Sequence, residues 1–505
     1  MKKILLILFV IFSLYGCGKP NQDLSTISIP YPADFTSLSP MVDISAHTEQ
    51  VLRNMHRTLL TYNAETKDFE LDMAEELNFD KNILYIKLKP NMLFHNNERI
   101  KASDVAYSFK RLAGHYPDFT STNEIWVQLL NKEKSEITIL DESSLTIKFN
   151  EDAISSSIYY AIADCFIVPE SVSEAEQSKN PIGAGPYKFD NYIPGLQIEF
   201  SAFNDYYGTA PEITKIIFKL YSDATSTLLA FKNNDINYIS LDSSSKDEIQ
   251  NIEGTTIYSN LMNDINIMYL NFNVEPFNNI KIRKAINYGI NKERIISLST
   301  ADIGKTTDTH LSKFMTNVYN ENLKNTYDYN PEKAKEILNE YGYNENNPLI
   351  LNLKTVAENN ISNDMALLLK DELYNVNIEI NIIPIPWEQY LPTVYLEKDY
   401  EATILQLFGY ANPYEVMSSN VSTDVGNLPG FNNKQYDELM NRAYHELDED
   451  KRNTYFKEAQ QILVDNAVAV YLGDRGEQVA LSKGYVGYEQ YPFPFIDVSI
   501  IKIER

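Results

Sequence analysis

Short runs of alternating hydrophobic and polar positions predict strands and helices in mixed order along this chain. Residues 84–88 place Leu, Ile and Leu two apart, with Tyr and Lys between them, which is the period of a half-buried strand. Residues 48–60 space their apolar side chains as one face of a helix does. The same patterns predict strands at 26–29, 136–140, 144–149, 187–189, 213–220, 236–239, 264–270, 349–354, 377–385, 402–407, 479–482 and 498–503, and helices at 102–112, 223–231, 281–290, 437–444 and 454–464. This mixture predicts the α/β fold class.

One further helix is delimited by its end signals. Asn330 and Pro331 have the residue types of an N-cap and a first helical position, and Gly342 suits the position after a helix end. No internal repeat is visible, and no long linker separates independent domains.

The first seventeen residues have the pattern of an export signal. Lys2 and Lys3 precede an apolar run over residues 4–14, which is too short to span a bilayer comfortably. The run ends in Leu-Tyr-Gly-Cys at residues 14–17, and this ending resembles a bacterial lipobox.

The lipobox resemblance implies that residues 1–16 are a signal peptide and that Cys17 becomes the first mature residue. Its thiol would carry a diacylglycerol with acyl chains such as palmitate. We then expect residues 17–25 to tether an extracytoplasmic protein to the outer face of a bacterial cell membrane. The alternative is a plain signal peptide with an incidental cysteine. Cys165 is the other cysteine, so no intramolecular disulfide is expected once Cys17 is acylated.

Charge and composition exclude some classes of partner and of chemistry. The chain has 505 residues and a formal net charge of −26, so nucleic acid is not an expected partner. Its six histidines form no HExxH or other short metal-ligand spacing, and no GxSxG nucleophile motif occurs. We therefore expect no catalytic residues, no metal ligands and no cofactor, although a carboxylate pair distant in sequence stays possible.

Five blocks, in the right order, resemble one known family. The first contains a Phe-His turn followed by Ala-Ser-Asp-Val-Ala-Tyr-Ser-Phe, and Asn97 stands where the family usually has Gly. The blocks are residues 84–95 with 100–109, 181–188 with 204–208, 231–236, 276–290, and 330–334 with 436–439. Together they resemble the peptide/nickel class of ABC-importer solute-binding proteins, bacterial extracellular solute-binding protein family 5.

This resemblance implies a two-lobed periplasmic-binding-protein-like fold of type II that closes by a hinge over a ligand. The N-terminal lobe would hold residues 22–262 plus 470–505, with an extra subdomain at about 63–179. The second lobe would hold residues 263–469. The implied function is to capture peptides outside the cell and to deliver them to the permease and ATPase subunits of an ABC importer.

The segment at 407–414 bears on the ligand. Peptide-binding relatives follow a Gly-Trp motif with an Asp that pairs with the ligand's α-ammonium; that Asp is missing here, and Glu415 is close. The segment looks more like the nickel-chelate branch, in which Phe408 matches a Trp and Asn412 matches an Asp. Phe408 and Tyr410 are candidate cleft walls. A nickel or other metal chelate, or another small solute, is therefore the alternative ligand.

Other candidates also come from the resemblance. Trp126 matches a cleft Trp, Asn123 matches a nearby Arg, and Cys165 stands where that branch has a ligand-contacting Arg. His47 and Asp43 follow the first strand on a loop that borders the cleft in the family. Trp126 is equally compatible with the core, and Cys165 with an inert small hydrophobe. A secreted lipoprotein enzyme or a signalling receptor is the remote alternative.

Overall fold

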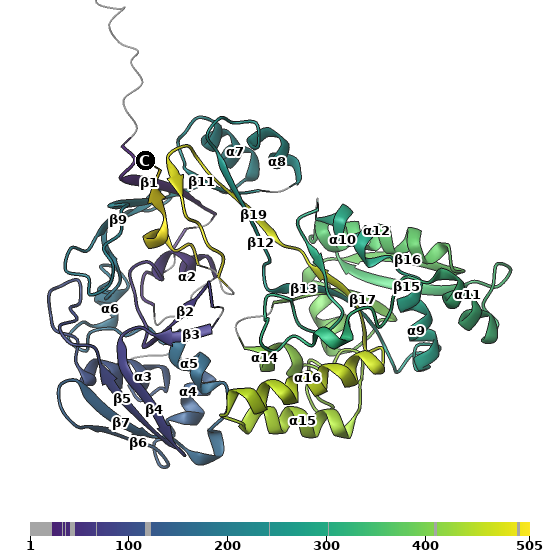
Figure 1. Ribbon diagram of the computed structural model, residues 1–505, viewed down its shortest axis with the longest axis horizontal. Helices are drawn as coiled ribbons and strands as arrows, with labels where there is room; N and C mark the ends of the chain where they lie inside the picture. The colour runs from purple at the N-terminus through teal and green to yellow at the C-terminus, as the bar shows by residue number, and fades with distance from the viewer. Residues whose placement is uncertain are drawn as a thin grey trace, which may run out of the picture.

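The computed structural model describes residues 23–32, 34–35, 37–40, 46–66, 68–116, 123–241, 243–300, 302–408, 412–491 and 495–504. These residues form an α/β chain with two lobes, which lie side by side in Figure 1. Within this part of the chain, no helix combines the length and the apolar character needed to cross a membrane.

The first lobe contains both chain ends of the described part and several sheets. One sheet has the order β1-β10-β9-β8, a second β11-β19-β12 and a third β4-β5-β7-β6. Its strands are β1 (Thr26–Tyr31), β2 (Leu60–Asn63), β3 (Asp68–Leu71), β4 (Ala74–Asp80), β5 (Ile83–Leu88), β6 (Glu136–Ile139), β7 (Ser144–Lys148), β8 (Tyr187–Ile193), β9 (Gln197–Ala202), β10 (Lys215–Leu220), β11 (Tyr238–Leu241), β12 (Thr256–Asn260), β19 (Glu477–Leu481), β20 (Tyr485–Val486) and β21 (Lys502–Ile503). Its helices are α2 (Ala46–Leu52), α3 (Ala102–Leu112), α4 (Glu124–Leu129), α5 (Ile158–Asp164), α6 (Glu174–Gln177), α7 (Ala224–Lys232) and α8 (Ser243–Ile249).

The second lobe is built on one six-stranded sheet of order β14-β18-β13-β17-β15-β16. Its strands are β13 (Asp264–Leu270), β14 (Lys305–Thr306), β15 (Leu349–Val356), β16 (Ile378–Ile385), β17 (Ala402–Phe408) and β18 (Ala469–Asp474). Its helices are α9 (Ile280–Tyr288), α10 (Lys292–Ser299), α11 (Pro331–Glu340), α12 (Asn360–Tyr374), α13 (Trp387–Tyr390), α14 (Pro413–Ser418), α15 (Lys434–His445) and α16 (Glu449–Asp465).

Between these sheets the chain crosses from lobe to lobe twice. It leaves β12 and enters β13 through residues 261–263, and it returns from β18 to β19 through residues 475–476. The return expected at residue 470 falls inside β18, which pairs with β13 on one side and β14 on the other. The crossing therefore lies about one strand length later in the chain.

Local sequence explains several elements directly. The Asn330 side chain caps α11 by accepting a hydrogen bond from Lys333 N at 3.0 Å, with Pro331 in the first turn, so the predicted start is confirmed. The predicted strand at 264–270 is found as β13, and all seven of its residues are buried, including the polar Asp264 and Asn266. The single helix predicted over 48–60 is wrong, because α2 ends at Leu52 and β2 begins at Leu60.

Two glycines fix the turn that follows α2. Gly185 N donates to Met55 O at 2.8 Å. A Cβ atom at Gly183 would lie 1.9 Å from Met55 O, and one at Gly185 would lie 2.7 Å from the Met55 carbonyl carbon. Only glycine allows this approach, which holds the turn containing Arg53 against the segment at 181–187.

Gly183→Ala should lower the free energy of unfolding by about 3 kcal/mol, because the new methyl group must displace packed backbone. Urea denaturation measures this loss. The control is Gly342→Ala, where no atom lies within 4 Å of the new Cβ and φ is +86°. That change should cost about 1 kcal/mol from backbone strain alone. Equal losses in the two variants would contradict the close approach.

Candidate ligand-binding site

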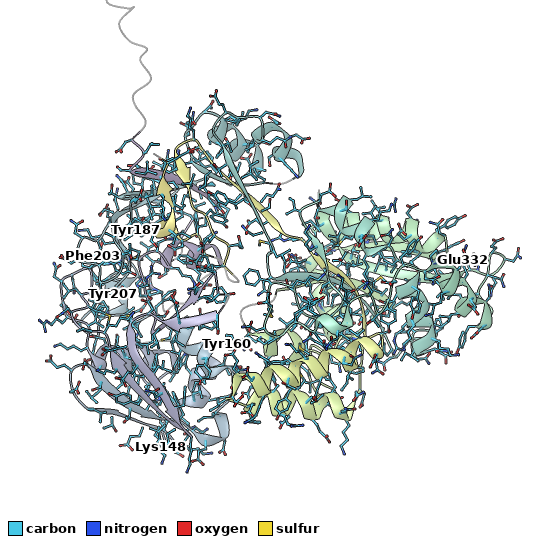
Figure 2. The ribbon with its side chains drawn as sticks, viewed as in Figure 1. Lys148, Tyr160, Tyr187, Phe203, Tyr207 and Glu332 are labelled. Atoms are coloured by element: carbon cyan, nitrogen blue, oxygen red, sulfur yellow. The ribbon has the colours of Figure 1, made fainter. Side chains whose placement is uncertain are left out.

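A cavity of about 380 Å³ is lined by residues of both lobes. Tyr62 of β2, Phe69 of β3 and Tyr160 of α5 come from the first lobe, and Phe314 and Arg452 come from the second. Figure 2 shows Tyr160 where the two lobes meet. A ligand in this cavity would therefore contact both lobes at once.

Aromatic rings form one wall of this cavity. The Tyr62 and Phe69 ring centroids are 5.6 Å apart and nearly perpendicular, and those of Phe69 and Tyr160 are 5.4 Å apart with similar geometry. The Phe314 ring lies 6.4 Å from that of Tyr62 at an interplanar angle of 21°. These contacts offer flat apolar surface for ligand side chains, with tyrosine hydroxyls for polar contacts.

A second cavity of about 230 Å³ shares Phe69 and Tyr160 with the first and carries a cluster of charges. Arg53 Nε donates to Glu49 Oε1 at 2.7 Å, and Arg53 Nη2 donates to Asp164 Oδ1 at 2.6 Å. Burial opposes the charge on Arg53, but these two carboxylates raise its pKa above the ordinary value. The guanidinium is therefore permanently charged and doubly paired.

Glu415 brings a third carboxylate to this cavity, from α14 of the second lobe. It accepts a hydrogen bond from Asn412 Nδ2 at 3.3 Å. Desolvation raises the pKa of Glu415, and the charge of Asp164 adds to the effect. No cation within 4 Å neutralises Glu415 among the described residues. Three carboxylates and one guanidinium line this cavity, and the excess of negative charge makes it attractive to a cationic group.

Two of the predicted residues line the same cavity. Asn123 and Asn412 do so as helix N-caps: the Asn123 side chain accepts from Ile125 N, and the Asn412 side chain accepts from Tyr414 N. Asn412 also donates through Nδ2 to Ser157 Oγ of the first lobe at 3.0 Å. Asn412 thus joins the two lobes beside the carboxylates.

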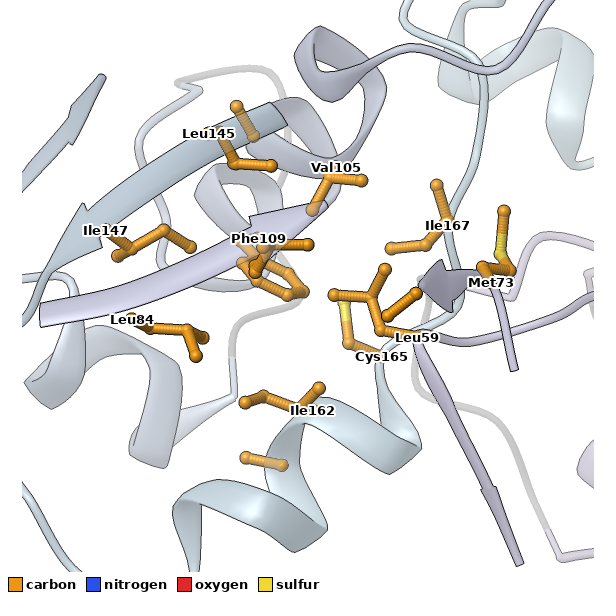
Figure 3. Close-up of a cluster of buried hydrophobic side chains, with 14 of the residues drawn as sticks. Leu59, Met73, Leu84, Val105, Phe109, Leu145, Ile147, Ile162, Cys165 and Ile167 are labelled. Atoms are coloured by element: carbon orange, nitrogen blue, oxygen red, sulfur yellow. The ribbon is translucent and has the colours of Figure 1, made fainter. Parts of the chain in front are cut away.

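Two other predicted residues lie in the hydrophobic core. Trp126 is 1% exposed and stacks on Phe109 with centroids 4.3 Å apart. Cys165 is fully buried, and Figure 3 shows it among Leu59, Ile162 and Ile167. Burial raises the pKa of the Cys165 thiol well above its ordinary value, so the thiol stays protonated.

The remaining candidates are described in part or not at all. Phe408 is the last residue of β17 and pairs with Asp264 of β13, and His47 belongs to α2. The side chains of both lie outside the description. Cys17, Asp43 and Tyr410 lie outside the described residues altogether.

Arg53, Phe69 and Tyr160 line the second cavity but were not predicted from the sequence. Glu49 and Arg53 are four residues apart, which is the spacing of an ion pair on a helix, and this signal was available. Phe69 carries no such signal. Its role depends on the pairing of β2 with β3, which places it opposite Tyr62.

Comparison with known proteins identifies the family of this chain. The model of bacterial extracellular solute-binding proteins, family 5, matches residues 68–427. The chain belongs to this family of extracellular proteins, whose members bind solutes.

Individual relatives are distant but cover nearly the whole chain. The oligopeptide-binding protein AppA of Bacillus subtilis is 24% identical, over 94% of this chain and 91% of its own. Its structure in complex with a nonapeptide matches 95% of this chain and 99% of its own, at a TM-score of 0.70. CtaP of Listeria monocytogenes matches 95% and 99% of the two chains at 21% identity and a TM-score of 0.82. NikA of Brucella suis, in complex with Fe(III)-EDTA, matches 95% and 100% at 18% identity and a TM-score of 0.81.

Trp126→Ala should lower the free energy of unfolding by about 3–5 kcal/mol, because it leaves a large cavity beside Phe109. Chemical denaturation measures this change. Trp387→Ala is the matched control, since Trp387 is 52% exposed and should cost about 0.5 kcal/mol. A stable Trp126→Ala variant with weakened ligand binding would instead place this side chain in the binding site.

Proposed function

We propose that this chain is the peptide-capturing subunit of an ABC importer. The observation that carries the proposal is the pair of adjoining cavities lined by both lobes, in which Glu415 faces Asp164 beside an aromatic wall. A peptide suits this arrangement because its α-ammonium matches the carboxylates and its side chains match the rings. The oligopeptide-binding relative and the nonapeptide complex of that relative support the same ligand class.

The alternative ligand, a metal chelate, fits this corner less well. A chelate held by carboxylate groups is anionic. In the second cavity it would meet Glu49, Asp164 and Glu415, and among the described residues that line this cavity Arg53 alone is cationic. Cys165, which stands where an arginine contacts the ligand in the chelate-binding branch, is buried and uncharged. The likeness to NikA supports a shared fold only. The choice between ligands therefore depends on the charges that line the cavity.

The two lobes would rotate about the crossings at 261–263 and 475–476 and close over the peptide, since ligand contacts to both lobes favour closure. The mature protein would begin at Cys17 and be held on the outer face of the cell membrane by its lipid. There it would deliver its ligand to the permease and ATPase subunits of the importer.

Glu415→Gln should weaken the binding of peptides with a free α-ammonium about tenfold or more. The reason is that the variant loses the charge-assisted contact between the Glu415 carboxylate and that ammonium. Isothermal titration calorimetry with a peptide series and its N-acetylated counterparts measures the effect. The acetylated peptides should bind both proteins equally. In the wild type, binding of free peptides should weaken as pH falls through the raised pKa of Glu415, and the variant should lack this contribution.

Glu332→Gln is the control for this experiment. Glu332 is exposed, pairs with Lys335 at 3.3 Å and lies at the far end of the second lobe in Figure 2. This variant should bind every peptide as the wild type does. Failure of the wild type to bind any peptide would overturn the proposed function, whereas equal binding by the Glu415→Gln variant would overturn the role of this carboxylate.

Cys17→Ala should release the exported protein from the membrane, because the acylated thiol would be its anchor. The measurement is the share of the protein that sediments with membranes after export. Cys165→Ala, which changes the chain's other cysteine, should leave that share unchanged. Equal sedimentation of the Cys17→Ala variant and the wild type would refute the lipid anchor.

A further inference from the structure

The two segments that cross between the lobes meet at one buried carboxylate. Asp474, the last residue of β18, is 1% exposed. Its Oδ1 accepts hydrogen bonds from Met262 N at 3.0 Å and from Gly476 N at 2.9 Å, and these two donors belong to the two different crossings. Its Oδ2 accepts from Ser312 Oγ at 2.5 Å. Asp474 therefore connects both crossings to the body of the second lobe.

A second buried carboxylate lies beside it. Asp264, the first residue of β13, is 1% exposed, and its Oδ2 accepts from Gln406 Nε2 at 2.7 Å and from Arg475 Nε at 2.9 Å. Its Oδ1 is buried without a hydrogen-bond partner among the described residues. Asp264 and Asp474 thus occupy the same crossing region, and the guanidinium of Arg475 pairs with Asp264.

The other charged groups near this region do not neutralise Asp474. Glu477 of β19 adds a third carboxylate, and its pKa is also raised, mainly by burial. Lys305 of β14 pairs in register with Asp474, but its side chain is exposed and forms no ion pair with Asp474. Burial, followed by the charge of Asp264, raises the pKa of Asp474 to about 6. Hydrogen bonds from Ser312, Met262 and Gly476 oppose this rise.

We propose that Asp474 is a proton-sensitive hinge residue whose protonation favours the present arrangement of the lobes. A rotation of one lobe against the other must change the crossings at 261–263 and 475–476, and with them the bonds that Met262 and Gly476 donate. Rotation that admits water to Asp474 stabilises its ionised form. A proton on Asp474 removes its repulsion with Asp264 and so stabilises the buried arrangement.

The direction of the pH dependence follows from linkage. A carboxyl group whose pKa is higher in one arrangement binds more protons there, so acid shifts the population toward that arrangement. Asp474 is 1% exposed in the arrangement described here, and a rotation that exposes it would lower its pKa. A fall in pH through about 6 then favours this arrangement, and a rise favours rotated ones. This effect needs no ligand and is independent of the proposed peptide binding.

Distances between the lobes in ligand-free protein test this proposal. Lys148→Cys and Glu332→Cys place a donor and an acceptor dye at exposed positions near the outer ends of the two lobes in Figure 2. A parent chain without these cysteines corrects for labelling of other thiols. Energy transfer in the wild-type background should change between pH 7.5 and pH 5.0 with a midpoint near 6.

Asp474→Asn should abolish this titration and hold the low-pH distance at every pH, because the amide is neutral and retains an acceptor oxygen. Ser312→Ala removes a donor that favours the carboxylate and should move the midpoint to higher pH, which keeps the test open if the first variant unfolds. Asp72→Asn is the control: this carboxylate is partly buried within the first lobe beside Arg57, and its loss should leave the midpoint unchanged. An unchanged titration in Asp474→Asn, or a pH-independent wild type, would overturn the proposal.

Discussion

The arrangement of the lobes depends on the hydrogen bonds that Asp474 accepts from the two crossing segments. Between the described sheets the chain passes from lobe to lobe at 261–263 and again at 475–476, and Asp474 holds one backbone N–H of each. Any rotation of the lobes acts on these short segments. The two cavities depend on these segments too, because residues of both lobes line each cavity and the angle between the lobes sets their separation.

Away from the hinge the lobes touch again through a few hydrogen bonds and through the buried ring contact of Tyr62 with Phe314. Ser156 N donates to Tyr444 O at 2.6 Å, and Asn412 donates to Ser157 Oγ at 3.0 Å. Individual hydrogen bonds of this kind contribute about 1 kcal/mol each to holding the lobes together. These bonds can therefore break without unfolding either lobe. Two short chain segments join the lobes, and the other contacts between them are weak. Such an arrangement allows a protein to admit and release a ligand between its lobes.

The sequence predicted the parts of the fold that depend on local pattern. The helix after Asn330 and the strand at 264–270 follow from cap residues and apolar periodicity, and both are found. The helix predicted over 48–60 was too long, because the approach of Gly183 and Gly185 to Met55 is a tertiary contact with no local signal.

The residues that line the cavities could not be predicted from local pattern. An aromatic residue matched to a cleft position has the same local pattern whether it faces solvent or core, and Trp126 is stacked on Phe109 in the core. The wall of the cavity joins Tyr62 to Phe314, which lie in different lobes, so no spacing rule brings them together. Resemblance identified the class of protein, whereas the identity of the lining residues required the packed structure.

Native mass spectrometry of protein purified without added ligand shows whether the space between the lobes holds a peptide. We expect a ladder of masses above that of the chain, and denaturation should release peptides with free amino termini. A metal-containing adduct, or the mass of the bare chain together with no uptake of added peptides, would contradict it.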